Sequence, residues 1–216
     1  ILVGFENGNL SIFTADSAGA LKLVQTVTTS HQTISKIATA GETLVTCGYE
    51  NFVEVYEISA SKGKISQVQT IEIDATTTMS ICLGLDLTTS AKHFTVSKQS
   101  DQVYVMEREK GKKYKIIAKF RPREEEHSTN VKLTDDGKHL LVIQESHSIG
   151  LWSSESRFEE PIDFKEGRYL LTADWDEKHK QFAVAHDTGV KLYALGDVIG
   201  LTKPNLKPGT NGKKGN

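Results

Sequence analysis

The sequence predicts an all-β protein made of repeated four-stranded antiparallel units, and two observations carry this prediction. First, a β-rich run, a tight polar turn and an alternating strand follow one another in TLVTCGYENFVEVYE, residues 43–57. Its β-branched and aromatic residues suit a pleated, half-buried surface. Second, the same phrase recurs four more times and always closes on a bulky residue. The five closing residues are Phe13, Tyr56, Met106, Trp152 and Tyr193.

The closing residues are spaced roughly 40–50 residues apart, and several short strands in such a period are typical of a β-propeller. A helical solenoid is disfavoured because no pattern of period 3.6 runs longer than two turns. We therefore expect about 4.5 blades of four antiparallel strands in residues 1–197. The expected blades are 1–28, 31–73, 76–120, 127–165 and 168–196. Residues 198–216, rich in Gly, Pro and Lys, are expected to form a flexible tail.

Each expected blade has strands a, b, c and d, from the inside outward. The first blade lacks strand a, and its remaining strands are 2–5, 10–14 and 21–28. The second blade has all four strands, at 33–39, 43–47, 52–58 and 65–73. The third blade also has four, at 79–87, 93–97, 102–107 and 114–120. The fourth has 130–134, 139–144, 148–153 and a short 161–164, and the fifth ends after 169–174, 181–185 and 190–194.

Turn residues agree with this division. The a-to-b turns of the fourth and fifth blades contain Asp135, Gly137 and Asp176, and Asp and Gly favour tight reversals. Gly48 lies in a b-to-c turn, where positive φ costs glycine little. The pair formed by Trp175 and Asp176 therefore belongs to an a-to-b turn and does not close a strand c.

Composition excludes several classes of function. The formal net charge is −2, from 26 basic and 28 acidic side chains, so a polyanion is not expected as the main partner. No apolar run approaches the roughly 18–20 residues that cross a bilayer. The chain opens on a strand-like phrase, so no signal peptide is expected. Cys47 and Cys82 lie in apolar strands as buried thiols, which favours a reducing compartment, cytoplasm or nucleus.

With their closing aromatic residues and polar turns, the repeats resemble the WD-repeat β-propeller family over residues 1–197. That family links a connecting His, a strand-b Ser or Thr, a turn Asp and a strand-c Trp by hydrogen bonds. The second blade matches with His31, Thr46, Glu50 and Tyr56. The fourth matches with His127 and Trp152 but has Ser146 in place of Asp, and the fifth matches with Asp187 and Tyr193. We assign structural roles to His31, Thr46, Tyr56, Trp152 and Tyr193.

The resemblance implies a closed ring, most often of seven blades. The chain would then be the C-terminal four to five blades of a longer propeller, with roughly two blades upstream. A ring of five blades is the alternative, but it would leave two blades incomplete.

No enzyme chemistry is expected from the sequence. The seven histidines show no metal-ligand spacing with Cys or carboxylates. No phosphate loop or nucleophile elbow is present, and paired carboxylates such as Glu159 and Glu160 lie in loops. We therefore expect no catalytic residue, no cofactor and no bound metal.

The resemblance implies a non-enzymatic scaffold, a WD-repeat subunit of a multi-protein complex. In that family partners dock on the face formed by the b-to-c turns and the d-to-a connections, here called the loop face. The expected contact residues on it are Glu50, Asn51, Asp101, Arg121, Arg123, Glu124, His147, Arg168 and Asp187. The alternative is a non-catalytic subunit of an RNA-processing, RNA-modifying or ribosome-assembly complex. Its basic rim would comprise Lys110, Lys112, Lys113 and Lys115.

Overall fold

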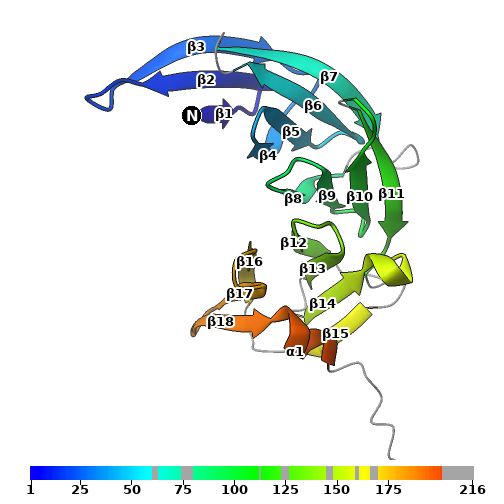
Figure 1. The fold of residues 1–216 in the computed structure, drawn as a ribbon. Coiled ribbons are helices and arrows are strands. Elements are labelled where there is room, and N and C mark those ends of the chain that lie inside the picture. Colours follow the sequence, from blue (N-terminus) through cyan, green and yellow to red (C-terminus); the bar gives the residue numbers. More distant parts are fainter. Residues whose placement is uncertain are drawn as a thin grey trace, which may run out of the picture.

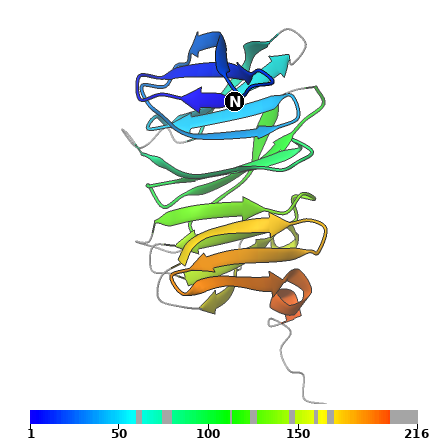
Figure 2. The ribbon, with the colours of Figure 1, turned by 90° about the vertical axis from the view of Figure 1, so that its left-hand side faces the viewer.

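The computed structural model shows five antiparallel β-sheets that follow one another along an open arc (Figure 1). It describes residues 1–59, 63–73, 80–111, 113–122, 127–144, 148–158, 161–165 and 170–200. We call the five sheets blades 1 to 5 in chain order. Figure 2 looks into the concave side of the arc, where the first strands of the blades lie above one another.

The strands of each blade are consecutive in the chain. Blade 1 contains β1 (Leu2–Gly4), β2 (Asn9–Ala15) and β3 (Leu21–Thr28). Blade 2 contains β4 (Ile34–Ala40), β5 (Thr43–Gly48), β6 (Phe52–Ser59) and β7 (Lys64–Glu72). Blade 3 contains β8 (Cys82–Leu87), β9 (His93–Lys98), β10 (Val103–Arg108) and β11 (Tyr114–Phe120).

Blade 4 contains β12 (Ser128–Leu133), β13 (His139–Gln144), β14 (Ser148–Ser153) and β15 (Pro161–Lys165). Blade 5 contains β16 (Leu170–Asp176), β17 (Gln181–His186) and β18 (Gly189–Ala194). A short 3-10 turn (Ser154–Ser156) follows β14, and the helix α1 (Leu195–Gly200) follows β18.

The prediction of an all-β chain with four-stranded antiparallel sheets is confirmed. The helix α1 was not predicted, and it occupies the start of the expected tail, while 201–216 lie outside the described residues. No helix in the described part of the chain is long and apolar enough to cross a membrane.

Irregularities in strand pairing recur at equivalent places. In blades 2 to 5, the pairing of the first and second strands shifts by one residue near the start of the first strand. The strand that carries the closing residue also shifts in its pairing with the next strand, directly before Phe13, Tyr56 and Met106. A bulge at a fixed position bends each sheet in the same way. The closing residues therefore occupy equivalent positions in these three blades.

The hydrophobic core lies between neighbouring blades. Val45 and Val55 of blade 2 pack with Phe94 and Met106 of blade 3 in one cluster. Corresponding clusters join blades 1 and 2, blades 3 and 4, and blades 4 and 5. Each blade therefore covers the apolar face of the next one, as expected for stacked repeats.

The two ends of the arc present sheet faces that no further blade covers. On blade 1, Leu21 and Leu23 are 56% and 52% exposed. On blade 5, Val190 and Leu192 are 67% and 61% exposed. Apolar side chains in the interior blades are instead mostly buried, so these two faces differ from the blade faces between them.

Candidate functional site

The expected hydrogen-bonded set of blade 2 lies mainly around the buried His31. Its Nδ1 is 2.8 Å from Oε2 of Glu50, and its Nε2 is 3.2 Å from Oγ1 of Thr46. Tyr56 is connected to this set through Glu54, because its hydroxyl donates to Oε2 of Glu54 at 2.5 Å and the same oxygen lies 3.8 Å from Nε2 of His31. Glu54 is fully buried and was missed by the sequence analysis.

Glu50 is turned toward this network. Burial alone would raise the pKa of its carboxyl group, but hydrogen bonds from the Gln32 amide and His31 lower it. The Gln32 amide donates to Oε1 at 2.6 Å. The carboxylate that we expected to contact a partner is therefore engaged within the blade.

A second histidine–carboxylate pair, also at a b-to-c turn, joins blades 3 and 4. Nδ1 of His127 lies 2.6 Å from Oδ1 of Asp101, so the histidine before β12 contacts the turn of blade 3. Lys98, fully buried, donates to the carbonyl oxygens of Gly48 and Glu50 at 3.1 and 2.8 Å. These contacts tie neighbouring blades together at their b-to-c turns.

The structure describes some of the remaining expected contact residues, and the others lie outside the described residues. The carbonyl oxygen of Asn51 accepts the Ile73 amide at 2.9 Å. Arg121 and Asp187 are exposed. The residues whose placement is not described are Arg123, Glu124, His147 and Arg168. Contact of this face with a partner stays a prediction.

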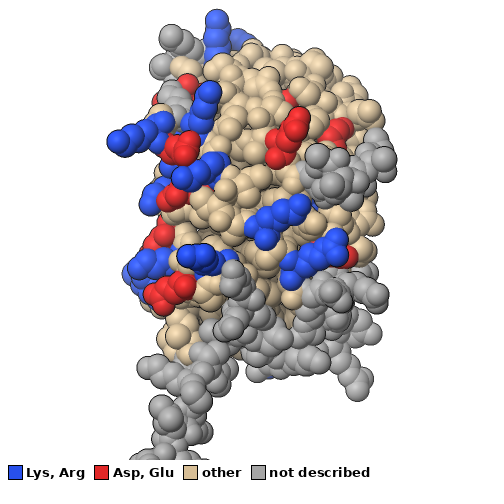
Figure 3. Space-filling model, turned by 90° about the vertical axis from the view of Figure 1, so that its right-hand side faces the viewer, with Lys and Arg blue, Asp and Glu red and all other residues tan. Residues whose placement is uncertain are grey.

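The expected basic rim is mixed in charge. Lys110 and Lys113 are exposed, and Lys115 pairs with Glu109 at 3.2 Å. Lys112 lies outside the described residues. Figure 3 looks toward the outer strands and shows Lys and Arg side chains interspersed with acidic ones along one edge. RNA contact at this rim stays a prediction.

The two other structural residues are Trp152 and Tyr193. Trp152 is buried, and its ring centroid is 5.5 Å from that of Phe120. Tyr193 is half-buried and packs against the cluster between blades 4 and 5.

The concave side of the arc carries a charged cluster that the sequence analysis did not identify. It contains one residue from the first strand of each of three consecutive blades: Asp86, Lys132 and Asp174. Nζ of Lys132 lies 2.8 Å from Oδ1 of Asp86 and 2.8 Å from Oδ1 of Asp174. The second oxygen of Asp86 accepts the amide of Leu133 at 2.8 Å. We call these three charged residues the inner triad.

Strand register explains why the triad residues meet. The residues of the second strand that oppose them are Thr95, Leu141 and Ala183. Each of these follows directly after a residue that opposes Met106, Trp152 or Tyr193. The three triad positions are therefore equivalent in their blades, and the innermost strands β8, β12 and β16 bring them together (Figure 1). The equivalent residue in blade 2 is Ala38.

The inner triad borders a cavity of about 460 Å³. Its polar wall also includes Asn130 and Thr172, whose side chains form a hydrogen bond of 2.7 Å between Nδ2 and Oγ1. Its apolar lining includes Ala183, Ala185 and Val190 of blade 5. Polar groups that converge on a concave site can fix the orientation of a small molecule.

Electrostatics favour the charged forms of Lys132 and Asp174. Burial alone would lower the pKa of Lys132, but the charges and hydrogen bonds of Asp86 and Asp174 raise it above its usual value. For Asp174, burial acts to raise the pKa, and the hydrogen bond and charge of Lys132 lower it. The Asp174 side chain is 76% exposed, whereas that of Asp86 is 10% exposed. The cavity therefore presents the accessible carboxylate of Asp174 beside the ammonium group of Lys132, which contacts both carboxylates.

Repeat position was the signal that could have revealed the triad. The segments LDL, VKL and ADW hold Asp86, Lys132 and Asp174 at the same position of strand a. Each of these residues alone looks like a solvated charge in a strand. Among the described residues, no group of three or more His, Cys, Asp or Glu side chains could hold a metal ion.

Comparisons with known proteins show the fold. No family model matches the chain, and no curated protein matches it significantly. A solved structure from Bacteroides uniformis, described as a "putative 6-phosphogluconolactonase", is similar with a TM-score of 0.65 and 13% identity. A structure from Lactobacillus plantarum is similar with a TM-score of 0.70 and 16% identity. Each match covers 89% of this chain and 63% of the other.

These neighbours correct the expected function. The prediction of a non-enzymatic scaffold, with an RNA-complex subunit as its alternative, is wrong, because the neighbour with a functional description is described as an enzyme. The prediction that the chain is not an enzyme conflicts with the same finding. Neither neighbour is described as a WD-repeat protein. At 13% and 16% identity, the likeness itself shows the fold alone.

Proposed function

We propose that the inner triad and its cavity form the site of a hydrolase that opens a sugar lactone. The carrying observation is the inner triad, which holds an ammonium group between two carboxylates beside a cavity of about 460 Å³. A lactone offers a carbonyl oxygen for the cation and hydroxyl groups for Asn130 and Thr172. The description of the Bacteroides uniformis neighbour supports this substrate class.

Each residue of the inner triad has a separate role in the proposed hydrolysis. Asp174 accepts a proton from the attacking water, whose oxygen forms a bond to the lactone carbonyl carbon. Lys132 stabilises the negative charge that develops on the carbonyl oxygen. The ring C–O bond then breaks, and the proton passes from Asp174 to the leaving alkoxide oxygen. Asp86 acts as a positioning residue, because it holds Lys132 and is itself held by the Leu133 amide.

We also propose that the five blades are part of a β-propeller ring that further blades complete. The repeated blades, the exposed faces of blades 1 and 5, and the 63% coverage of both neighbours support this arrangement. The 216-residue chain alone is then expected to self-associate through its uncovered faces. A monodisperse monomer with a cooperative thermal transition, measured by light scattering and calorimetry, would argue against ring completion.

The hydrolase proposal is tested with Asp174→Asn. Removal of the general base is expected to lower kcat/KM for 6-phosphogluconolactone by about 10²–10⁴-fold. Because the pKa of Asp174 is lowered and that of Lys132 is raised, the wild-type rate above the spontaneous reaction should be nearly constant from about pH 5 to pH 9. Acid release in a pH-stat measures both quantities, with the unphosphorylated lactone as a second substrate.

Asp187→Asn is the matched control. It makes the same substitution on an exposed aspartate of blade 5 that does not line the cavity. Its rate should equal that of the wild-type protein. Equal loss in both variants, or no loss in Asp174→Asn, would remove the inner triad from the proposed mechanism.

A further inference from the structure

A second cavity, of about 230 Å³, lies between blades 2 and 3 and shares no lining residue with the inner cavity. It opens beside the β4–β5 and β8–β9 turns, at the ends of the strands opposite the b-to-c turns. Its size is below the range of about 300–1,000 Å³ that is usual for drug-sized ligands. A ligand that fills it must therefore be small.

Arg108 lines this cavity, and its side chain lies beside the ring of Tyr114. Its backbone amide donates to the carbonyl oxygen of Lys92 at 2.7 Å. The guanidinium carbon lies 6.0 Å from the centroid of the Tyr114 ring, and the Tyr114 hydroxyl is itself hydrogen-bonded to the Ala91 carbonyl. A guanidinium group beside this ring can receive a planar carboxylate through its fork of N–H donors.

Arg108 has an unmet hydrogen-bonding requirement. Its Nε atom is buried and has no hydrogen-bond partner among the described residues. A buried donor without an acceptor is costly, so such groups in proteins are usually paired with protein, water or ligand. An acceptor in the cavity would satisfy it.

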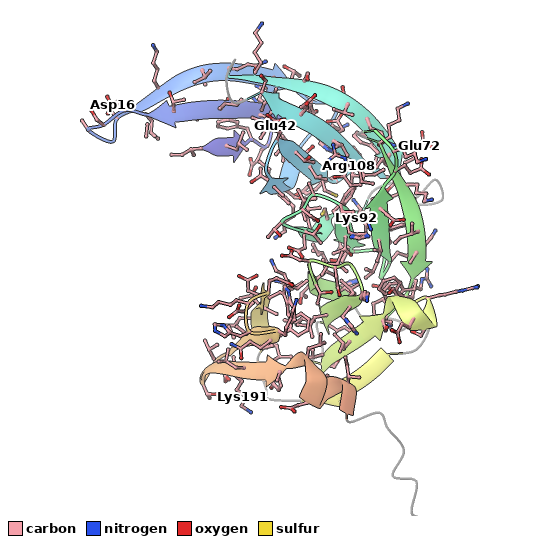
Figure 4. All side chains as sticks on the ribbon, in the orientation of Figure 1. Asp16, Glu42, Glu72, Lys92, Arg108 and Lys191 are labelled. Atoms are coloured by element: carbon pink, nitrogen blue, oxygen red, sulfur yellow. The ribbon has the colours of Figure 1, made fainter. Side chains whose placement is uncertain are left out.

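Two carboxylates line the same cavity, those of the exposed Glu42 and the half-buried Glu57. Glu42, in the β4–β5 turn, lines the same cavity and forms no ion pair with a described residue. Figure 4 labels Glu42 on blade 2 and Arg108 on blade 3. Although both border one cavity, the two charges do not pair with each other. Ala40, Val55 and Val68 add apolar side chains to the lining.

We propose that this cavity binds a small zwitterion, an α-amino acid with a short aliphatic side chain. The carboxylate lies on Arg108, the ammonium group faces Glu42, and the side chain contacts the apolar lining. An anion without an ammonium group leaves Glu42 unpaired, and an amine without a carboxylate leaves Arg108 unpaired. Recognition of both charges therefore selects the zwitterion over either half.

Titration calorimetry with L-valine tests the proposal on the full chain. We expect L-valine to bind, and 2-methylpropanoate and isobutylamine, which each lack one charge, to bind at least about tenfold more weakly. Arg108→Gln and Glu42→Gln should each weaken L-valine binding by about tenfold or more. Binding of both single-charge compounds as tightly as L-valine would overturn the proposal.

Two variants outside the cavity serve as matched controls. Glu72→Gln changes an exposed glutamate of blade 2, and Arg121→Gln changes an exposed arginine after β11. Both should bind L-valine like the wild-type protein, and thermal melting should show that all four variants are folded. If Arg108→Gln does not fold, L-valine binding by Glu42→Gln alone tests the proposal. No L-valine binding by the wild-type chain, or unchanged binding by Glu42→Gln, would overturn the proposal.

Discussion

Replacement of Trp152 by alanine is expected to lower the free energy of unfolding by about 3–5 kcal/mol, the usual range for removing a large buried aromatic side chain. Trp152 is 2% exposed, opposes Leu140 in the strand pairing and packs against Phe120. Gly150 allows this position of the ring, since a Cβ atom there would lie only 2.3 Å from the indole. Urea denaturation measures the loss.

Trp175→Ala is the control for Trp152→Ala. Trp175 is only half-buried at the end of β16, where its Nε1 donates to Glu177 at 2.7 Å and its ring packs on Phe182. Its replacement should cost less than that of Trp152. A larger loss in Trp175→Ala would mean that the literal Trp-Asp pair, and not the closing residue of β14, is the structural tryptophan.

Replacement of Lys132 by methionine is expected to destabilise the fold by about 3 kcal/mol, because it leaves the nearly buried carboxylate of Asp86 without its cation. The exposed pair with Asp174 adds little, since such pairs contribute about 0–1 kcal/mol. The double variant Lys132→Met with Asp86→Asn removes the unpaired charge, keeps an oxygen that can accept the Leu133 amide, and should recover most of the stability. Chemical denaturation of both variants measures the difference.

Lys22→Met, on the exposed strand β3, controls for the loss of a lysine. It should unfold at the same urea concentration as the wild-type protein. If the double variant is no more stable than Lys132→Met, the loss does not come from the unpaired Asp86 carboxylate.

Much of the fold could be predicted because local sequence patterns indicate the individual strands. The alternation around Val53 and Val55, and the bulky residue that closes each third strand, identify strands whatever lies beside them. The helix α1 could not be seen in this way, since it is short and precedes a segment rich in Gly and Pro. Val198, from that helix, is nevertheless buried in the core between blades 4 and 5.

The candidate site was harder to predict because it depends on neighbours from different blades. Asp86, Lys132 and Asp174 are separated by more than forty residues each and meet only through equivalent strand register. Glu54 was missed for a similar reason. In sequence it resembles the solvated position of an alternating strand, yet Tyr56, Gln67 and the Ser30 amide surround its carboxylate. Contacts between chain segments, rather than residue type, decide such roles.

His127 gives a further example. The family pattern places the connecting histidine with a turn residue of its own blade, which would be Ser146. In the structure His127 pairs with Asp101 of the preceding blade, and Ser146 lies outside the described residues. The same residue types therefore form a contact between blades, and a pattern within one repeat could not have predicted it.

The measurement that tests the central claim most directly is the initial rate of 6-phosphogluconolactone hydrolysis near pH 6.5, by the wild-type chain and by Asp174→Asn. We expect the wild-type protein to exceed the spontaneous rate and the variant to lose nearly all of that excess. Wild-type protein that leaves the spontaneous rate unchanged, or a variant as active as the wild type, would contradict the assignment of the inner triad as a lactone-hydrolysing site.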